Sequence, residues 1–400
     1  MLKTGGKFSY IIPNKWMRAG YGQALRQWLQ SYSLMELLDF GDLPVFEEAT
    51  TYPLIVSVTK QQPELNYRFK AVTINTLQFE KSLTNYVAEN AFDVQADLLP
   101  ASGWTLSNSI AQQLLEKLKN TGTPLGEYVD GKIYRGVLTG LNEAFVIDEA
   151  TAERLIDEDE RSARVIKRFI AGRDVKRYQK PKVDKYLILF PAGFTYERME
   201  DSELEPWEWI KENYTSLANF LAPHEEKAKK RADKGNFWWE LRACAYYHEF
   251  QKNKILFQEI ATFQAFTWDE VGAYSNNKTF IIPNADLYLL GLLNSKVTWY
   301  FINQIASKLQ GGALAMQTPY TFQIPIVSGD EETKATITSL VEQILTIKQA
   351  DAAANTSRLE AEIDVLVYRL YNLTYDEVLL VDPAFALTEA AYNQPEVSYN

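Results

Sequence analysis

The pattern of apolar and polar positions predicts alternating strands and helices in the first part of the chain. Short apolar runs predict strands at 7–12, 37–40, 45–46 and 54–58, and helical spacing of apolar residues predicts a helix over 20–29. Pro13 and Asn14 end the first run. No glycine-rich turn between a strand and a helix precedes the strand predicted at 7–12. Residues 1–75 are therefore expected to be the last units of a larger Rossmann-like fold.

The rest of the chain changes character twice. Residues 76–100 are expected to be a connector that leads into a helix over 108–119. Between 101 and 330, short strand candidates separated by Gly, Asn and Pro alternate with helical patterns over 151–167 and 287–305. Over 331–400, apolar residues recur at three- and four-residue steps and predict two long helices. The predicted fold class is mixed α/β: a partial Rossmann-like remnant, then a mixed α/β domain, then C-terminal helices.

Composition narrows the class of protein. The chain has 400 residues, 46% of them hydrophobic and 23% charged, which is ordinary for a folded protein of two or three domains. One cysteine, Cys244, and two histidines exclude an internal disulfide and a structural zinc site with four Cys or His ligands. No apolar run reaches the 18 or so residues of a membrane helix, and the N-terminus does not resemble a signal peptide. A cytoplasmic protein is expected.

Motifs for common catalytic machinery are not found in the sequence. It contains no GxSxG, HExxH, P-loop or GxGxxG pattern, so hydrolase, zinc protease, NTPase and dinucleotide-enzyme functions have no motif support. His224 and His248 are interpreted as structural residues, and the paired carboxylates, such as Glu225 and Glu226, as solvated faces. We therefore assign no catalytic, cofactor-binding or metal-ligating residue from these patterns.

Charge is distributed unevenly along the chain. The net charge of −11 argues against a protein that binds nucleic acid over its whole surface. Residues 161–185, however, hold ten Lys or Arg and only two Asp, and we call them the basic segment. Residues 351–400 hold nine acidic residues and two Arg, so the C-terminal helices are expected to avoid DNA.

Three stretches supply candidate DNA contacts. Arginine forks bind phosphates or guanine edges, lysines act as point charges, and aromatic rings pack on sugars or bases. The candidates are Lys167, Arg168, Arg173, Lys176, Arg177 and Tyr178 in the basic segment, Arg135, Thr139 and Asn142 in a glycine-containing turn over 133–147, and Lys308 and Gln310 in a later loop. The alternatives are a solvated charged face for the first, a tight hairpin without a ligand for the second, and a plain surface loop for the third.

Several of these stretches belong to a set of motifs that resembles one family. The ordered segments are KIYRGVLTGLNEAFVID (132–148), VIKRFIAGRDVKRY (165–178), FWWELRACAYYHEFQKNKILFQEI (237–260), TFIIPNADLYLLGLLNSKVTWYFI (279–302) and YTFQIPI (320–326). Together they resemble the TaqI-like C-terminal specificity domain, over about residues 100–330. That resemblance implies the target-recognition module of an adenine-specific DNA methyltransferase, as in type IIG restriction-modification enzymes, with double-stranded DNA as the partner.

The N-terminal stretch is similar to the end of the methyltransferase domain in the same enzymes. The matching segments are GGKFSYIIPNKWMRAGYGQALRQWL (5–29) and LLDFGDLPVFEEATTYPLIVSV (37–58). The resemblance implies that Phe46 stacks on the adenine flipped out of the duplex, whereas the alternative is a core residue at a strand end. The S-adenosylmethionine loop, the Asn-Pro-Pro-Tyr or Asn-Pro-Pro-Phe motif and the nuclease of the fused enzymes are not in the sequence. The resemblance thus implies S-adenosylmethionine as cofactor of the parent enzyme and none for this chain, which alone is expected neither to methylate nor to cut DNA.

Three functional hypotheses follow, and all share this fold. In the first, the chain reads a DNA sequence as the target-recognition part of an adenine methyltransferase in a restriction-modification system. In the second, it is a protein-interaction module of a phage-defence complex, whose basic segment docks an acidic partner. In the third, it is half of a split active methyltransferase, and the missing methyltransferase or nuclease part is its partner. The chain is then either a piece of a longer protein or the product of a split gene.

Overall fold

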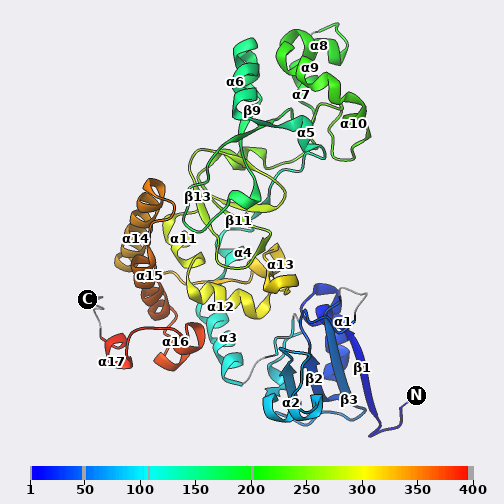
Figure 1. The fold of residues 1–400 in the computed structure, drawn as a ribbon, viewed down its shortest axis with the longest axis vertical. Coiled ribbons are helices and arrows are strands. Elements are labelled where there is room, and N and C mark those ends of the chain that lie inside the picture. Colours follow the sequence, from blue (N-terminus) through cyan, green and yellow to red (C-terminus); the bar gives the residue numbers. More distant parts are fainter. Residues whose placement is uncertain (1, 47–50, 102, 107–108, 200–201, 395–400) are drawn as a thin grey trace.

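The computed structural model describes residues 2–46, 51–101, 103–106, 109–199 and 202–394. The N-terminal residues form a sheet beside the base of a larger central body, whose far end carries a group of short helices (Figure 1). The C-terminal helices lie along one side of this body (Figure 1). The mixed α/β class expected from the sequence is confirmed.

A five-stranded sheet forms the N-terminal part. Its strands are β1 (Lys7–Pro13), β2 (Ser33–Asp39), β3 (Pro53–Thr59), β4 (Arg68–Thr73) and β5 (Phe92–Gln95), in the spatial order β1-β3-β2-β4-β5. Only the β2–β4 pair is parallel. Helix α1 (Gln23–Gln30) contributes Leu29 to the core on one face, where Leu54, Val56 and Phe69 are buried. The other face buries a smaller cluster that includes Val72.

The expected connector belongs to this sheet. Residues 76–100 contain helix α2 (Leu83–Asn90) and strand β5, which pairs with β4. Ser82 caps α2, because its hydroxyl accepts the Asn85 N–H. A second expectation also differs from the structure: Val45 and Phe46 lie beyond β2 and outside any strand. The helix expected over 20–29 and the strands over 7–12, 37–40 and 54–58 overlap α1, β1, β2 and β3.

Two four-stranded sheets form the central body. One has the order β14-β9-β10-β8 and the other β13-β11-β15-β7. Their strands are β7 (Tyr134–Arg135), β8 (Val146–Asp148), β9 (Ile166–Ile170), β10 (Lys185–Ile188), β11 (Lys254–Gln258), β13 (Thr267–Asp269), β14 (Tyr274–Ser275) and β15 (Thr279–Pro283). Two short pairs, β6 (Thr123–Pro124) with β17 (Pro325–Ile326) and β12 (Ile260–Ala261) with β16 (Leu314–Ala315), tie later loops to this body. The turn over 133–147 is therefore not a hairpin, because β7 and β8 belong to different sheets.

Helices surround these sheets. They are α3 (Ser109–Thr121), α4 (Leu125–Tyr128), α5 (Asn142–Phe145), α6 (Glu149–Glu158), α7 (Phe194–Arg198), α8 (Pro206–Asn213), α9 (Thr215–Leu221), α10 (Glu225–Lys230), α11 (Leu287–Leu293), α12 (Lys296–Ile305) and α13 (Thr318–Thr321). The C-terminal helices are α14 (Glu331–Ala350), α15 (Ser357–Leu370), α16 (Tyr375–Val381) and α17 (Glu389–Tyr392). The two long helices predicted after residue 330 are α14 and α15.

Two helix predictions and one strand prediction need correction. The helix expected over 151–167 ends at Glu158, and Lys167 instead lies in strand β9. The pattern over 287–305 is two helices, because Ser295 caps a new one by accepting the Thr298 N–H with its hydroxyl. The segment YTFQIPI is not one strand: Tyr320 lies in α13, and only Pro325–Ile326 pairs as a strand.

Candidate nucleic-acid interface

The turn at the centre of the basic segment is held rigidly and presents its arginine to solvent. The Gly172 N–H donates to Asn276 Oδ1 at 3.2 Å, and Gln258 Nε2 donates to the carbonyls of Gly172 and Val175, both at 2.9 Å. The Arg173 side chain is 77% exposed, and Asp174, its ion-pair partner, lies 3.9 Å away. A fixed backbone that carries an exposed guanidinium suits contact with a phosphate. The long ion pair with Asp174 leaves most of the guanidinium accessible to such a partner.

The other candidates in the basic segment divide into two groups. Arg168 and Lys176 are exposed like Arg173. Lys167 is half-buried in β9, and this desolvation lowers the pKa of its ammonium. Arg177 and Tyr178 face the protein interior instead, where burial raises the pKa of the Tyr178 phenol.

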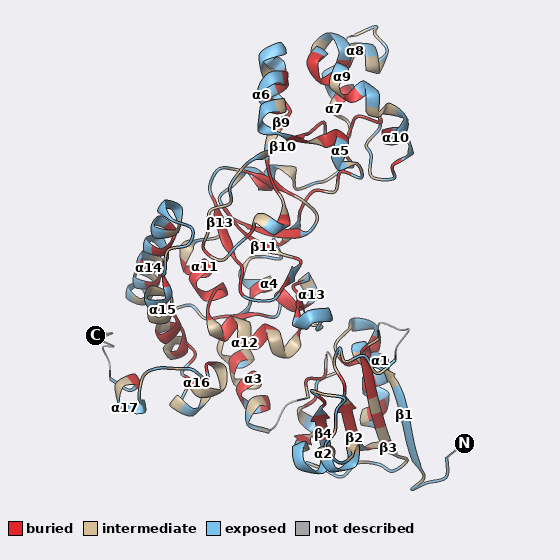
Figure 2. Cartoon of the chain, in the orientation of Figure 1, coloured by how far each residue is buried: buried red, intermediate tan, exposed pale blue. Residues whose placement is uncertain are grey.

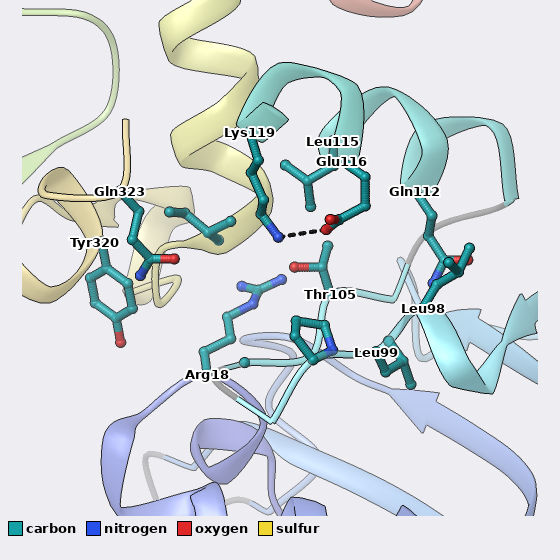
Figure 3. A pocket seen from close by; sticks show the side chains of 13 residues that line it. Arg18, Leu98, Leu99, Thr105, Gln112, Leu115, Glu116, Lys119, Tyr320 and Gln323 are labelled. Atoms are coloured by element: carbon teal, nitrogen blue, oxygen red, sulfur yellow. Dashed lines mark hydrogen bonds and ion pairs between the residues drawn. The ribbon is translucent and has the colours of Figure 1, made fainter. Parts of the chain in front are cut away.

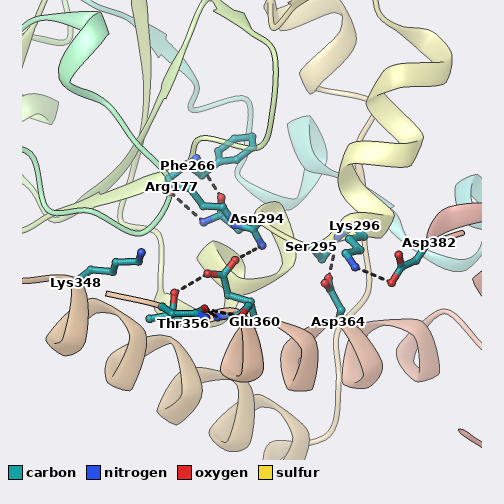
Figure 4. A network of polar contacts seen from close by, with 12 residues as sticks. Arg177, Phe266, Asn294, Ser295, Lys296, Lys348, Thr356, Glu360, Asp364 and Asp382 are labelled. Atoms are coloured by element: carbon teal, nitrogen blue, oxygen red, sulfur yellow. Dashed lines mark hydrogen bonds and ion pairs between the residues drawn. The ribbon is translucent and has the colours of Figure 1, made fainter. Parts of the chain in front are cut away.

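Arg177 joins the basic segment to the C-terminal helices. Figure 4 shows its guanidinium directed towards Glu360 of α15, and Arg177 Nη2 lies 2.9 Å from Glu360 Oε2. The guanidinium also lies over the ring of Tyr178, 5.5 Å from its centroid. This pairing places Arg177 in a structural contact, and the same holds for the buried Tyr178.

The glycine-containing turn is closed by its own polar groups. Thr139 is buried, and its hydroxyl donates to Asn142 Oδ1 at 2.5 Å, while the carbonyl of Thr139 accepts from the buried Arg231. Gly140 has a φ of +67°, the left-handed region that glycine adopts without strain. Asn142 is exposed, and its side-chain oxygen accepts the hydrogen bond that closes this turn.

Arg135 lies at a groove that the sequence did not reveal. The groove has a volume of about 400 Å³ and is lined by Arg135, Arg242, Cys244, Tyr246 and Asn277, among others. Arg135 Nη2 pairs with Glu259 Oε1 at 2.6 Å, and its Nε donates to the Asn277 carbonyl at 2.9 Å. Arg242 was not among the candidates, because a single arginine in an apolar stretch carries no sequence signal. The ring of Tyr134, next to Arg135, stacks on that of Tyr246 with centroids 4.6 Å apart, and this contact brings the segment that holds Arg242 to the same groove.

The loop with Lys308 and Gln310 faces the N-terminal sheet across a cleft of about 340 Å³. Asp39 and Asp42 line it from the sheet side and Lys308 from the loop side. The Gly311 N–H donates to Asp42 Oδ2 at 3.2 Å. Desolvation, together with the nearby Arg18, lowers the pKa of the Lys308 ammonium. Gln310 is exposed, and so is Phe46, which is therefore not a core residue at a strand end.

A compact contact below this cleft fixes the N-terminal sheet to the central body. Figure 3 shows Arg18 reaching towards Thr105 and towards α3, which carries the ion pair of Lys119 with Glu116. Arg18 Nη1 donates to the Ala306 carbonyl at 3.0 Å, and the Thr105 hydroxyl donates to the Gln304 carbonyl at 2.7 Å. Burial lowers the pKa of Arg18, and the nearby Asp39 opposes this shift. The width of the cleft is thus set by buried polar contacts.

Within the described ranges, no group of three or more His, Cys, Asp or Glu side chains is arranged to hold a metal ion. No helix in these ranges is both long and apolar enough to cross a bilayer. The two glycines after β1 have different surroundings, and a Cβ at Gly20 would meet no atom within 4 Å. A Cβ at Gly22 would lie 2.0 Å from the Trp16 carbonyl oxygen, so protein packing already fills that space.

Two known families are similar to parts of this chain, one to the central body and one to the N-terminal residues. The TaqI-like C-terminal specificity domain matches residues 167–326, and the Eco57I restriction-modification methylase family matches residues 1–46. Residues 167–326 of this chain are similar to a TaqI-like C-terminal specificity domain. The match includes the basic segment from Lys167 onwards and the loop with Lys308, whereas Arg135, Thr139 and Asn142 precede it.

Several restriction-modification proteins are similar to this chain. The type II restriction enzyme and methyltransferase RM.Eco57I of Escherichia coli is 26% identical over 38% of this chain and 15% of its own length. The type II methyltransferases M.BanIII of Aneurinibacillus aneurinilyticus and M.PaeR7I of Pseudomonas aeruginosa are 21% and 22% identical over 86% and 94% of this chain. The chain spans only 64% and 63% of those two methyltransferases.

A solved structure supports the same fold over nearly the whole chain. The type IIL restriction-modification enzyme MmeI, solved in complex with DNA, aligns with 95% of this chain and 49% of its own, with a TM-score of 0.56. The sequence identity is 10%, so the likeness concerns the fold alone.

Proposed function

We propose that this chain reads the target sequence on double-stranded DNA, as the recognition part of an adenine-specific methyltransferase in a restriction-modification system. The observation that carries the proposal is a set of exposed cations in the region similar to a TaqI-like specificity domain. Arg168 projects from strand β9, and Arg173 and Lys176 project from the hydrogen-bonded turn that follows it. Cations held in this way neutralise phosphates and fix the register of a protein on the duplex.

Sequence reading is assigned to the groove beside this turn. Arg135 and Arg242 line it, and an arginine fork matches the two acceptors on the major-groove edge of guanine. The Arg135 side chain is half-exposed, and its guanidinium is paired with Glu259. This ion pair orients the guanidinium before DNA binds. Phe46 retains the role of stacking on a flipped adenine as part of this proposal. S-adenosylmethionine belongs to the parent enzyme and is not assigned to residues of this chain.

The test is fluorescence anisotropy of a labelled random-sequence duplex across a series of salt concentrations. Log affinity should fall linearly with log salt, since each neutralised phosphate releases counterions. The variant Arg173→Glu/Lys176→Glu should bind roughly tenfold or more weakly, with the salt slope reduced by about 2. Its matched control is Lys334→Glu/Arg358→Glu, which makes the same charge change near the N-termini of α14 and α15, where acidic residues are favourable.

The outcomes separate the hypotheses. If both charge-reversal variants weaken binding equally, the interaction reports net charge and the assignment to the turn fails. If the unmodified chain does not bind DNA at low salt, the proposal fails and the basic segment becomes a docking surface for an acidic protein. Restoration of methylation when a second chain is added would support the split-methyltransferase hypothesis.

A further inference from the structure

The segment between β11 and β13 places an aromatic side chain in solvent. Phe263 is 54% exposed, and Ile260, three residues earlier, is 49% exposed. Their neighbours Ala261 and Gln264 are buried. Figure 2 shows β11 and β13, the strands that precede and follow this segment, as buried. Two apolar side chains therefore project into solvent from a segment whose flanking strands belong to the core.

Hydrogen bonds fix the backbone of this segment at both ends. At its start, Ala261 lies in β12, which pairs with β16. At its end, the Phe266 N–H donates to Asn294 Oδ1 at 3.1 Å, and the Phe266 carbonyl accepts from Asn294 Nδ2 at 2.9 Å. Asn294 is fully buried. Residues 262–265 alone separate the two anchors, so Phe263 is presented to solvent by a short and fixed loop.

Exposed cations lie on one side of this loop. The carboxylate of Glu259, the residue before β12, pairs with Arg135 at 2.6 Å and with Lys278 at 3.1 Å. Both cations are exposed, whereas Glu259 is buried. Lys278 also adjoins the turn of the basic segment, because a Cβ at Gly172 would lie 3.3 Å from the Lys278 Cβ. The loop therefore borders the phosphate and base contacts of the proposed function.

A further cation lies on the other side of β12. Strand β16 pairs with β12 along one edge, and its Leu314 pairs with Lys308 along the other. Since neighbouring strands lie about 4.8 Å apart, Lys308 follows β12 at roughly 10 Å. Ile260 and Phe263 thus stand between the cations paired with Glu259 and the loop that carries Lys308.

The size and the surroundings of this apolar pair favour DNA over a protein as its partner. A stable protein interface buries about 800 Å² on each side, far more than two half-exposed side chains offer. The cations around the pair attract phosphates. Phe and Ile are among the side chains that proteins insert between base pairs, where they unstack one step and bend the duplex. A fixed loop suits this role, because a mobile side chain would fold back on the protein instead.

We propose that Phe263, with Ile260 beside it, is a wedge that enters one base step of the bound duplex. The proposal rests on the proposed function, because the neighbouring cations must hold the duplex against the loop. Steps that unstack readily, such as TA and CA, cost the least energy to open. The wedge therefore adds a preference for deformable sequence to the base contacts of Arg135. Unstacking at this step also lowers the cost of extruding a nearby base, which is the step assigned to Phe46.

The test compares binding of the full chain to two pools of labelled random-sequence duplexes, one fully paired and one with a central mismatched base pair. A mismatched step is already weakly stacked, so the unmodified chain should bind the mismatched pool roughly fivefold or more tightly. Phe263→Ala should bind the two pools equally. Its salt slope should not change, because the phosphate contacts remain. Phe263→Trp, which keeps an aromatic wedge, should retain the preference.

Two further variants serve as controls. Ile347→Ala removes an exposed apolar side chain from α14, among the acidic C-terminal helices, and should change neither the preference nor the salt slope. Phe46→Ala is measured as well, because extrusion of an adenine would by itself favour a mismatched duplex. Circular dichroism confirms that each variant folds.

The proposal is overturned if the unmodified chain binds DNA without distinguishing the two pools, or if Phe263→Ala keeps the preference. A preference that Phe46→Ala loses and Phe263→Ala keeps belongs to base extrusion and not to a wedge. A reduced salt slope for Phe263→Ala also contradicts the proposal, since the side chain would then support the cations and not enter the duplex. These results leave the proposed function standing. If the unmodified chain binds neither pool at low salt, the proposed function itself fails and the wedge with it.

Discussion

Arg173 and Arg177 are four residues apart in the basic segment, yet they occupy different environments. The Arg173 side chain is 77% exposed, whereas that of Arg177 is 24% exposed and paired with Glu360. We expect Arg177→Ala to lower the free energy of unfolding by roughly 1–3 kcal/mol, because it leaves a half-buried carboxylate without its cation. The salt slope of DNA binding should not change. Arg173→Ala should do the reverse: no loss of stability, and a slope reduced by about 1. Urea unfolding and salt-dependent anisotropy measure the two effects, and a reduced slope for Arg177→Ala would return this residue to the interface.

At the scale of single residues, the sequence predicted which residues are cationic better than it predicted which of them are exposed. The basic segment, with the exposed candidates Arg168, Arg173 and Lys176, was visible in the sequence because charge density is a local property. The burial of Tyr178 and the pairing of Arg177 were not, because they depend on α15, which lies about 180 residues away along the chain. Arg242 was missed for the same reason, since a contact between segments far apart in the sequence, the stack of Tyr134 on Tyr246, brings it to the groove with Arg135.

Helices α11 and α14 approach each other closely at one glycine. A Cβ at Gly291 would lie 2.7 Å from Ile337 Cγ2 and 3.2 Å from Val341 Cγ2. Alanine usually stabilises a helix relative to glycine, but here Gly291→Ala should destabilise the protein by roughly 1–3 kcal/mol through overpacking. In an Ile337→Ala background the same substitution should cost little, because space is available. A double-mutant cycle by urea unfolding measures this coupling. Equal effects of Gly291→Ala in the two backgrounds would show that the helices are free to separate.

Elements with long, regular apolar spacing were the ones that the sequence predicted well. Helices α14 and α15 carry apolar residues at three- and four-residue steps over several turns. Most of these residues are buried in α14, and those of α15 are buried or partly buried. The helix expected over 151–167 failed at its end, because Asp159 caps a short turn that leads into β9. A hairpin was the alternative interpretation of the turn over 133–147, because both flanking runs are apolar, but β7 and β8 pair with distant segments instead.

At the scale of the whole molecule, the N-terminal sheet is a separate body with its own core. Leu54 and Phe69 lie in a cluster of buried residues distinct from that of the central body, which includes Leu292. The contacts described between the two parts are mainly polar, such as those of Arg18 and Thr105. The sequence indicated separate N-terminal and central parts, but only the structure shows that the segment from 76 to 100 completes the sheet. Its fifth strand is four residues long, too short for a clear pattern.

This division predicts two thermal transitions. Leu54 and Leu292 are both fully buried, so truncation of either should cost about 2–5 kcal/mol. We expect Leu54→Ala to lower the melting temperature of one transition only, by roughly 10 °C or more, because a small domain shifts several degrees for each kcal/mol. Leu292→Ala should lower the other transition by a smaller amount, since the larger body has the larger unfolding entropy. Differential scanning calorimetry of the two variants resolves the transitions. If each variant shifts both transitions together, the sheet and the central body unfold as one cooperative unit, and the polar contacts between them are then strong enough to couple the two bodies.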